Sequence, residues 1–518
     1  MPHLLIDCLD ARRRLPGGRP PMISGDAGSV TDEDLHARVR HLAAGLRSAG
    51  TQPGDRILVR LPNGPDFTAL WLAAAYLGAI PVMAATSLGA REIAGIIADS
   101  EPTTVVTADV GFSRVAEVAA MPGTRCTWLS LGATVTGLER LERLAASAAP
   151  LPHPSPASPD AVASIVYTVA ADGTSRGACH SAEAMIASAR AYAHGVLGLS
   201  PADVVAGHPP MSFAYGLGAL LIFPLVTGAR VVLTDGFDAE RLLRTIERER
   251  VTVFFGTATG YRLFLRIPGL TTRFNLRSLR ACVSAGEPLD AATSAEWQRQ
   301  TGVDLLDGLG TSELFHIVLS QRPGDVIHGS LGTPVPGYDA RVVDAEMSDV
   351  GPGTAGRLAV RGPTRCRYWN RPDAERDYVR DGWNLTGDLV TRDSAGRYWF
   401  ERRADDLIIS AGYNIAGPEI ESVLLTHPAV IASAVVAAPD ATRGVVPKAY
   451  VVARSAGTPA LALALQEHVH RALAGYKTPR QVEFIAALPM IDGRIDRASL
   501  RAMALEARRG EFRTEPLP

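Results

Sequence analysis

Short apolar runs alternate with longer amphipathic stretches along much of the chain. An amphipathic stretch at residues 34–49 is followed by the turn Pro53-Gly54-Asp55 and by an apolar run at 56–60. Further apolar runs occupy 80–84 and 104–108. Runs of this length, bounded by turn residues, are typical of buried strands, and apolar positions spaced by three or four residues are typical of helices. This order of strand, helix and strand predicts a parallel α/β architecture.

The same alternation continues beyond a proline-rich segment at residues 149–160, which we expect to be an exposed connector without regular structure. The strands predicted after it are at 163–168, 230–233, 251–255 and 279–283. A strand at 358–361 belongs to an antiparallel region, and a helix and strands after residue 417 suggest a compact α+β unit of roughly 110 residues. The predicted fold class is therefore α/β, with a large N-terminal α/β domain of several subdomains and a small mobile C-terminal α+β domain.

Composition narrows the functional classes. At 518 residues the chain is too long for one core, so we expect at least two domains. A formal net charge of −2 leaves no excess of basic residues for a phosphate backbone, which argues against a nucleic-acid partner. No apolar run reaches the roughly 18 residues needed to cross a bilayer. The five cysteines are scattered singly. These features predict a cytoplasmic protein with no nucleic-acid or membrane partner.

The stretch from Trp383 to Glu421 carries the clearest chemistry. Thr386-Gly387-Asp388 is followed by Arg403-Ala404-Asp405-Asp406 and an apolar run that ends at Gly412. A carboxylate that accepts from a diol and a guanidinium that donates in a fork suit a ligand rich in hydroxyls and phosphates. The pattern resembles the adenylate-forming superfamily of acyl-CoA synthetases, peptide-synthetase adenylation domains and luciferases, and is most similar to benzoate- and medium-chain acyl-CoA ligases.

That resemblance covers nearly the whole chain and implies a domain organisation. The large AMP-binding domain would span residues 1–402, the hinge 403–406, and the small domain 407–518. Asp388 and Arg403 would contact the ribose of AMP, and Asp405 would be the pivot about which the small domain turns between two half-reactions.

Two further motifs match the superfamily and are implied to bind the nucleotide. Ser284-Ala285-Gly286-Glu287 follows a predicted strand, and its turn would pack flat against adenine. Asp307-Gly308-Leu309-Gly310-Thr311-Ser312-Glu313 would place Thr311 on the α-phosphate and Glu313 on Mg²⁺, which prefers carboxylate oxygen. The implied nucleotide-binding residues in these motifs are Ala285, Gly286, Glu287, Asp307, Gly308 and Leu309, with Thr311 and Glu313 counted as catalytic.

The acyl pocket and the coenzyme A site are also implied by the resemblance. Phe213, Tyr215, Gly310 and His316 would surround the acyl group, although ordinary core packing explains the two aromatic residues nearly as well. Gly412 would let the pantetheine arm of coenzyme A pass close to the backbone. Lys477 and Arg480 are candidate contacts to coenzyme A phosphates, with solvated helix-end charges as the alternative.

Two places depart from the family pattern. The loop that should cradle the ATP phosphates with hydroxyls and glycines reads Val169-Ala170-Ala171-Asp172-Gly173, so a carboxylate stands where phosphate would lie. In the last loop Arg494 replaces a lysine that holds the carboxylate and α-phosphate during adenylation, and a planar fork is not equivalent to a compact ammonium. However, lysine occurs only at Lys448 and Lys477 while arginine is abundant, so Arg494 also fits a chain-wide preference.

These departures lead to one hypothesis and three alternatives. The hypothesis is an acyl-CoA ligase that makes the thioester from acyl-AMP and coenzyme A, releases AMP, and has a weakened or lost adenylation step. It would take acyl-AMP from a separate adenylating ligase, as in the non-adenylating ligases of platensimycin-type terpenoid pathways. The alternatives are a complete ligase using ATP and Mg²⁺, an enzyme that loads a carrier-protein thiol, and an inactive binder of acyl-AMP or coenzyme A. The resemblance also implies a small-molecule acyl substrate and a homodimer.

Overall fold

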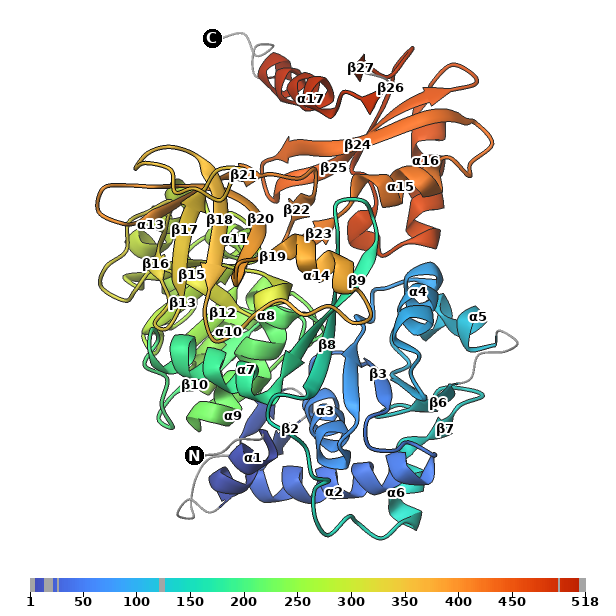
Figure 1. Ribbon diagram of the computed structural model, residues 1–518, viewed down its shortest axis with the longest axis vertical. Helices are drawn as coiled ribbons and strands as arrows, with labels where there is room; N and C mark the ends of the chain where they lie inside the picture. Colours follow the sequence, from blue (N-terminus) through green and yellow to red (C-terminus); the bar gives the residue numbers. More distant parts are fainter. Residues whose placement is uncertain (1–4, 14–21, 26–27, 121–125, 492–493, 512–518) are drawn as a thin grey trace.

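The computed structural model describes residues 5–13, 22–25, 28–120, 126–491 and 494–511, without the side chains of 494 and 507–511. Two sheets with helices around them form a large body, and a smaller unit made from the C-terminal residues lies against one end of it (Figure 1). This arrangement confirms the predicted fold class. The predicted boundaries at 402 and 407 stay predictions, because the structure shows only that β21 ends at Arg403 and β22 begins at Ile408.

The first sheet is built mainly from the predicted parallel strands. In the described residues its order is β7-β6-β5-β3-β4-β8-β9, and every pairing is parallel except that of β8 with β9. Its strands are β3 (Arg56–Arg60), β4 (Ile80–Met83), β5 (Thr104–Thr107), β6 (Thr127–Ser130), β7 (Glu139–Arg140), β8 (Val162–Val169) and β9 (Ser175–Ser181). The central positions of β3 and β5 are successive apolar residues, because both faces of these strands are buried.

The second sheet is parallel at one end and antiparallel at the other. Within the described chain its order is β17-β18-β20-β21-β16-β15-β14-β13-β12-β10-β11-β1-β2, with β19 beside β20. The parallel region comprises β1 (Ile23–Gly25), β10 (Val204–Gly207), β11 (Arg230–Leu233), β12 (Val253–Gly256), β13 (Ala281–Ala285) and β14 (Leu305–Gly310), with β2 (Gly28–Val30) antiparallel at its edge. The antiparallel region comprises β15 (Ile317–Ser320), β16 (Ser330–Pro334), β17 (Asp339–Val343), β18 (Gly356–Arg361), β19 (Val379–Arg380), β20 (Trp383–Arg392) and β21 (Tyr398–Arg403).

Helices cover both sheets of the body. The α-helices are α1 (Leu5–Arg13), α2 (Asp32–Ser48), α3 (Pro65–Leu77), α4 (Ala90–Ser100), α5 (Ala116–Ala119), α6 (Leu141–Ser147), α7 (Ala182–Ser188), α8 (Ala214–Leu217), α9 (Phe223–Thr227), α10 (Ala239–Glu249), α11 (Ala258–Leu265), α12 (Leu270–Arg273), α13 (Ala291–Thr301) and α14 (Pro372–Tyr378). Two π-helical segments, η2 (Ala189–His194) and η3 (Gly218–Ile222), and two 3₁₀ turns, η1 (Phe112–Arg114) and η4 (Ser312–Leu314), complete the body. No described helix has the length and apolar character needed to span a membrane.

The C-terminal unit is the predicted α+β structure. It begins with a hairpin of β22 (Ile408–Ser410) and β23 (Tyr413–Ile415). The remaining elements are α15 (Gly417–Leu424), β24 (Val430–Asp440), β25 (Gly444–Ala453), α16 (Pro459–Ala472), η5 (Gly475–Lys477), β26 (Gln481–Phe484), β27 (Met490–Ile491), β28 (Arg494–Ile495) and α17 (Arg497–Glu511). We call the part from β22 onward the small domain.

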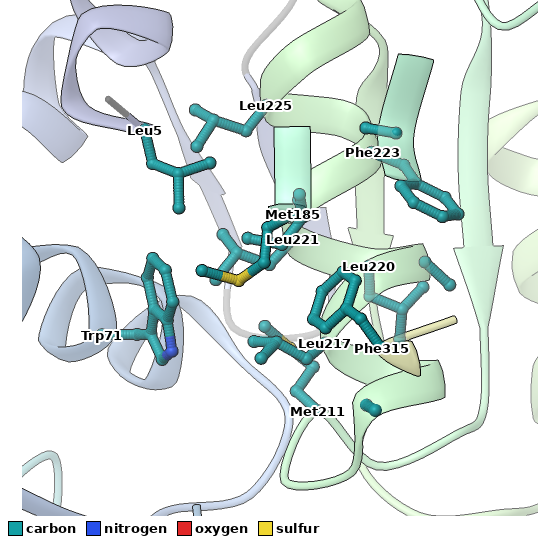
Figure 2. Close-up of a cluster of buried hydrophobic side chains, with 14 of the residues drawn as sticks. Leu5, Trp71, Met185, Met211, Leu217, Leu220, Leu221, Phe223, Leu225 and Phe315 are labelled. Atoms are coloured by element: carbon teal, nitrogen blue, oxygen red, sulfur yellow. The ribbon is translucent and has the colours of Figure 1, made fainter. Parts of the chain in front are cut away.

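A dense apolar core joins the two sheets of the body. Figure 2 shows Trp71 of α3 and Leu5 of α1 facing Met185 of α7 and Leu221 of η3. All four side chains are buried, and the cluster to which they belong includes residues from both sheets. Large buried side chains of this kind contribute roughly 1.5–3 kcal/mol each, so we expect the two sheets to behave as one rigid platform beneath the small domain.

One segment differs from its predicted form. The sequence suggested a loop beginning at Val169, but β8 continues to Val169 and β9 begins at Ser175, so the segment is the turn of a β-hairpin. Figure 1 shows this hairpin rising from the body toward the small domain. Local periodicity missed β9 because its pairing with β8 depends on a partner strand and not on its own apolar pattern.

Candidate active site

A cavity of about 560 Å³ lies where the carboxyl ends of the parallel strands of the second sheet meet the small domain. This edge of a parallel sheet is where ligands usually bind. Most predicted site residues line it, namely Val169, Ala170, Ala171, Asp172, Phe213, Tyr215, Ala285, Gly286, Glu287, Asp307, Gly308, Leu309, Gly310, Thr311, Glu313, His316, Asp388, Arg403, Asp405 and Gly412. Among the described side chains, Gly173, Lys477 and Arg480 lie outside this lining, and the side chain of Arg494 is outside the described part.

The turn after β13 is held rigidly. Gly286 has φ +86°, a backbone conformation that glycine adopts without strain. The buried carboxylate of Glu287 accepts hydrogen bonds from the amide of Thr259 at 2.6 Å and from its hydroxyl at 3.0 Å. Burial raises the pKa of Glu287. Glu287 therefore fixes the turn to α11, and the flat backbone at Gly286 is left facing the cavity.

The segment after β14 presents a hydroxyl and a carboxylate to the cavity. The Thr311 hydroxyl accepts from the amide of Leu314 at 3.2 Å and shares a 3.2 Å hydrogen bond with the hydroxyl of Tyr378. The hydroxyl of Tyr368 donates to Glu313 at 2.7 Å. Sequence reasoning missed both tyrosines, because neither follows a motif and each meets its partner only through the fold. Both line the cavity, so the region around Thr311 and Glu313 is richer in hydroxyl groups than the motifs indicate.

The donor set in this region fits a magnesium ion bound together with a nucleotide. Glu313 supplies one hard oxygen, and the described residues contain no group of three or more His, Cys, Asp or Glu side chains that could hold a metal alone. Magnesium is commonly bound through one or two carboxylates plus substrate phosphates and water. Glu313 would therefore hold Mg²⁺ only in company with ATP.

Residues of the predicted hinge form a charged cluster with Asp388 at another part of the cavity lining. Arg403 donates to Asp388 at 3.0 Å and makes a two-pronged contact with Asp405 at 2.9 and 2.5 Å. Burial by itself disfavours the guanidinium charge, but the two carboxylates outweigh it and raise the pKa of Arg403. A Cβ added to Gly387 would lie 2.1 Å from Arg403 Nη2, so glycine there gives the guanidinium its space. In this arrangement Asp405 is clamped to the body.

The floor of the cavity is an aromatic pocket organised by His316. The residue before it, Phe315, has φ +71°. The amide of His316 donates to the carbonyl of Leu314 at 2.9 Å, so residues 314–316 form a γ-turn with positive φ, which is rarer than the inverse form. His316 Nε2 donates to the carbonyl of Tyr215 at 3.2 Å. Burial lowers the pKa of His316 to about 3, so the ring is neutral. His316 therefore adds no charge to the pocket.

The size of this pocket depends on small residues. A Cβ on Gly218 would lie 2.4 Å from His316 Cδ2, and a Cβ on Gly310 would lie 2.3 Å from the His316 carbonyl oxygen. The Tyr215 hydroxyl lies 3.0 Å from the carbonyl oxygen of Gly256, so its ring is held as a wall. Phe213 also lines the cavity, but its ring packs against Tyr413 of the small domain, with the centroids 5.7 Å apart.

A narrow backbone passage lies at the β22–β23 turn. Ala411 and Gly412 have φ +50° and +82°, as a two-residue hairpin of type I′ requires. A Cβ on Gly412 would meet Thr257 Cγ2 at 3.0 Å, and one on Gly286 would lie 3.6 Å from Gly412 Cα. Tyr413 stacks on Tyr476 with the centroids 4.1 Å apart. The turn of the small domain thus closes against α11 and the β13 turn of the body.

The two predicted coenzyme A contacts have different surroundings. Lys477 is buried, with its ammonium between Glu92 of α4 and Glu419 of α15. Arg480 is exposed, and burial of part of its side chain together with nearby Arg443 lowers its pKa. Arg480 is therefore open to a ligand in this arrangement, whereas Lys477 is occupied by carboxylates.

The segment predicted to cradle the ATP phosphates is a hairpin turn in which the Asp172 carboxylate accepts hydrogen bonds from neighbouring residues. The amide and hydroxyl of Thr174 donate to the Asp172 carboxylate at 2.8 and 2.6 Å, and Arg176 lies 3.5 Å from its other oxygen. Burial opposes ionisation of Asp172, but these contacts hold its pKa below the usual value. The negative charge is therefore partly balanced within the turn itself.

Comparison with protein families finds two matches that follow one another along the chain. The model described as AMP-binding enzyme matches residues 10–368. The model described as AMP-binding enzyme C-terminal domain matches residues 419–492.

Curated relatives match along nearly the whole chain. The benzoate–CoA ligase of Thauera aromatica is 35% identical over 509 residues, covering 96% of this chain and 95% of the relative. The 4-hydroxybenzoate–CoA/benzoate–CoA ligase of Rhodopseudomonas palustris is 32% identical over 488 residues, covering 92% and 89%.

Solved structures match with similar coverage. The anthranilate CoA ligase AuaEII in complex with anthranoyl-AMP has a TM-score of 0.76 and 28% identity, covering 98% of this chain and 99% of that one. The amide bond synthetase McbA of Marinactinospora thermotolerans has a TM-score of 0.87 and 29% identity, covering 97% and 99%. A double mutant of the o-succinylbenzoate CoA synthetase of Bacillus subtilis, bound to the product analogue OSB-NCoA, has a TM-score of 0.83 and 25% identity, covering 96% and 98%.

Proposed function

The chain belongs to the AMP-binding enzyme family and is an acid–thiol ligase of the acyl-CoA synthetase type, and we propose that it performs both half-reactions of such an enzyme. In the first, a carboxylic acid and ATP give acyl-AMP and pyrophosphate. In the second, the thiol of coenzyme A loses its proton, the sulfur–carbon bond forms, and the bond between the acyl carbon and the phosphate oxygen of AMP breaks.

One observation carries this proposal. Groups suited to phosphate (Thr311, Glu313), to ribose (Asp388) and to the passage of a thiol arm (Gly412) come from distant parts of the chain and line one cavity. The Thr311 hydroxyl accepts from an amide and shares a hydrogen bond with the Tyr378 hydroxyl; with Tyr378 as the donor of that bond, the proton of Thr311 is available to donate to an α-phosphate. Magnesium, when bound with ATP, would neutralise phosphate charge, and Glu313 would hold it in place with its orientation set by Tyr368.

Two findings favour a complete ligase over one with a weakened first step. The sequence suggested that Asp172 repels the ATP phosphates, but its carboxylate is occupied by Thr174 and Arg176 within the turn. The relatives that match almost the whole chain are named as CoA ligases. We therefore propose that no separate adenylating partner is needed, with ATP and Mg²⁺ as cosubstrate and metal.

The remaining roles are proposals of the same kind. We assign Ala285, Gly286, Glu287, Asp307 and Leu309 to the adenine side of the nucleotide. We assign Arg403 to the ribose contact and to the hinge, where it clamps Asp405. Arg494 would supply the cation that holds the substrate carboxylate in the first half-reaction, and Arg480 would contact a coenzyme A phosphate. The homodimer and the cellular location stay predictions.

The substrate class follows from the shape and polarity of the pocket. Tyr215 and neutral His316 form an uncharged aromatic wall, and the backbone of Gly308 and Gly310 lines the same cavity. Aromatic rings pack favourably against such walls, edge-to-face or offset. The named relatives act on benzoate and 4-hydroxybenzoate. We propose an aromatic carboxylic acid of about the size of benzoate as the substrate.

The test separates the half-reactions. Pyrophosphate exchange is measured with benzoate-type acids, ATP and Mg²⁺, and thioester formation is measured with preformed benzoyl-AMP and coenzyme A. We expect both to proceed. Glu313→Gln should lower exchange at least tenfold, whereas the exposed control Glu401→Gln should leave it unchanged.

Each other outcome points to a different reading. Thioester without exchange would restore the weakened-adenylation hypothesis, and neither activity over a broad acyl panel would support an inactive binder. Transfer to an amine but not to coenzyme A would instead favour an amide synthetase, the activity in the name of one structural relative.

A further inference from the structure

The two lysines of this chain stand out because arginine supplies all its other long-chain cationic residues. Only Lys448 and Lys477 are lysines among 52 lysine and arginine residues. Both are buried, with 4% and 2% of their surface exposed. Lys448 pairs with Glu483 at 2.7 Å, and both lie on strands of the small domain. Lys477 is different, because its partners come from two different parts of the molecule.

Lys477 joins the small domain to the body. Its ammonium contacts Glu92 of α4, in the body, and lies 2.8 Å from Glu419 of α15, in the small domain. The three side chains are 2%, 6% and 12% exposed in the order Lys477, Glu92 and Glu419. A compact ammonium on a flexible stem reaches two carboxylates in a small buried space, whereas a planar guanidinium needs more room. This geometry gives a physical reason for lysine at this position.

Glu92 anchors more than the lysine. Its carboxylate also accepts from the amide of Gly89, at the start of α4, at 2.8 Å and from the amide of Ala474 at 3.0 Å. A Cβ on Gly89 would lie 3.1 Å from the carbonyl oxygen of Ala472. The turn before Lys477 is therefore docked directly on the N-terminal end of α4, by backbone as well as by side chain.

The same contacts continue into the active site. Tyr476, next to Lys477, stacks on Tyr413, which follows Gly412 at the narrow passage. On the other side, a Cβ on Gly173 would lie 3.4 Å from the amide nitrogen of Glu419, so the tip of the β8–β9 hairpin touches α15. Figure 1 shows the β8–β9 hairpin reaching the region of α15. Any rotation of the small domain must separate Lys477 from Glu92 and lift α15 from the hairpin.

We propose that Lys477, Glu92 and Glu419 form a buried charged latch that holds the small domain in the arrangement for thioester formation, and that they act as positioning residues for that half-reaction alone. This inference rests on the proposed function. The arrangement with Gly412 at the passage is the one in which a thiol arm could reach the acyl group.

The latch and a direct contact between Lys477 and coenzyme A predict different kinetic effects. If Lys477 instead bound a coenzyme A phosphate, Lys477→Met would raise the KM for coenzyme A. Glu92→Gln, which removes a nearby negative charge, would then leave that KM unchanged or lower it. If the latch is correct, both variants lower kcat for thioester formation, and the KM for coenzyme A changes little.

The experiment compares three variants, Lys477→Met, Glu92→Gln and the double variant, with Lys448→Met as the matched control. For each, the rate of thioester formation from preformed benzoyl-AMP is divided by the rate of pyrophosphate exchange in the same preparation. We expect this ratio to fall at least tenfold in the single variants and no further in the double variant, and to stay within twofold of wild type in the control. Because both rates scale with the folded fraction, incomplete folding cannot produce a selective loss.

Two results would overturn the latch: an unchanged ratio in Glu92→Gln, or effects of the two single variants that multiply in the double variant. Failure of the proposed function is recognised separately, because wild type would then show neither half-reaction. In that case small-angle X-ray scattering tests the latch directly. Lys477→Met should give a more open particle than wild type and Lys448→Met, and identical scattering profiles would exclude it.

Discussion

Replacing Gly412 with alanine should obstruct the second half-reaction without harming the first. Gly412 has φ +82°, and a left-handed backbone costs an alanine roughly 1–2 kcal/mol. The added methyl group would also meet Thr257 Cγ2 at 3.0 Å, which is closer than ordinary contact. Overpacking of this kind typically costs 1–3 kcal/mol, which corresponds to a rate loss of roughly 5- to 150-fold if it falls on the path of the thiol arm.

The chain offers a matched control for the backbone strain. Gly396 has φ +81°, and a Cβ there meets nothing within 4 Å. Gly396→Ala should therefore lower the free energy of unfolding by about the same 1–2 kcal/mol and leave the ratio of the two half-reactions unchanged. Urea unfolding measures the change in the free energy of unfolding. The thioester and pyrophosphate-exchange assays measure the ratio of the rates of the two half-reactions.

A second-site change sharpens the test. Thr257→Ser removes only Cγ2, the atom that the new methyl group would meet, and keeps the hydroxyl that accepts from the amide of Gly260 at the start of α11. In the Gly412→Ala background this change should restore most of the thioester rate. Equal losses of both half-reactions in Gly412→Ala, or no recovery with Thr257→Ser, would refute the assignment of this gap as the passage.

Three further expectations test other parts of the molecule. Gly218→Ala has no backbone strain to bear, but its methyl group would displace His316, so kcat/KM for an aromatic acid should fall roughly 5- to 150-fold while the KM for coenzyme A is unchanged. Burial opposes ionisation of Asp203, but hydrogen bonds from Arg280 and Thr252 lower its pKa, so Asp203→Asn should lower the free energy of unfolding by about 1–3 kcal/mol at pH 7. Because that contribution is complete above the unfolded-state pKa of about 4 and is lost as pH falls through the lower folded-state value, the difference from wild type should shrink in acid urea titrations. Chelating Mg²⁺ should abolish pyrophosphate exchange, whereas thioester formation from preformed benzoyl-AMP should persist.

Parts of this fold could be predicted from local pattern because local physics decides them. The predicted strands at 56–60 and 230–233 coincide with β3 and β11, since strands covered on both faces carry apolar residues at successive central positions. The central motif after β14 could be located because a small-residue turn at the end of a buried strand already indicates a ligand edge. The predicted strands at 251–255 and 279–283 overlap β12 and β13 but are displaced by one or two residues at each end.

The polar partners of the site could not be predicted in this way. The hydroxyl of Tyr368 meets Glu313 across 55 positions, and Glu92 meets Lys477 across 385. Contacts over such separations leave no trace in local periodicity. Asp172 shows the same limit at short range. The sequence shows that a carboxylate stands at this position, but its hydrogen bonds with Thr174 form only because β9 pairs with β8 and closes the turn.

For this protein the sequence by itself determined the layered α/β body, the small α+β domain and the residue types available for nucleotide and thiol chemistry. The reason is that the pattern of buried residues and the conformation of turns depend on residues that are close together in the chain. Only the tertiary structure decided which charges are neutralised and which are free. Asp172 is balanced within its own turn, Arg403 is paired with Asp405, and Lys477 joins the small domain to the body. Charge pairing depends on distance in space, and folding sets that distance independently of position along the chain.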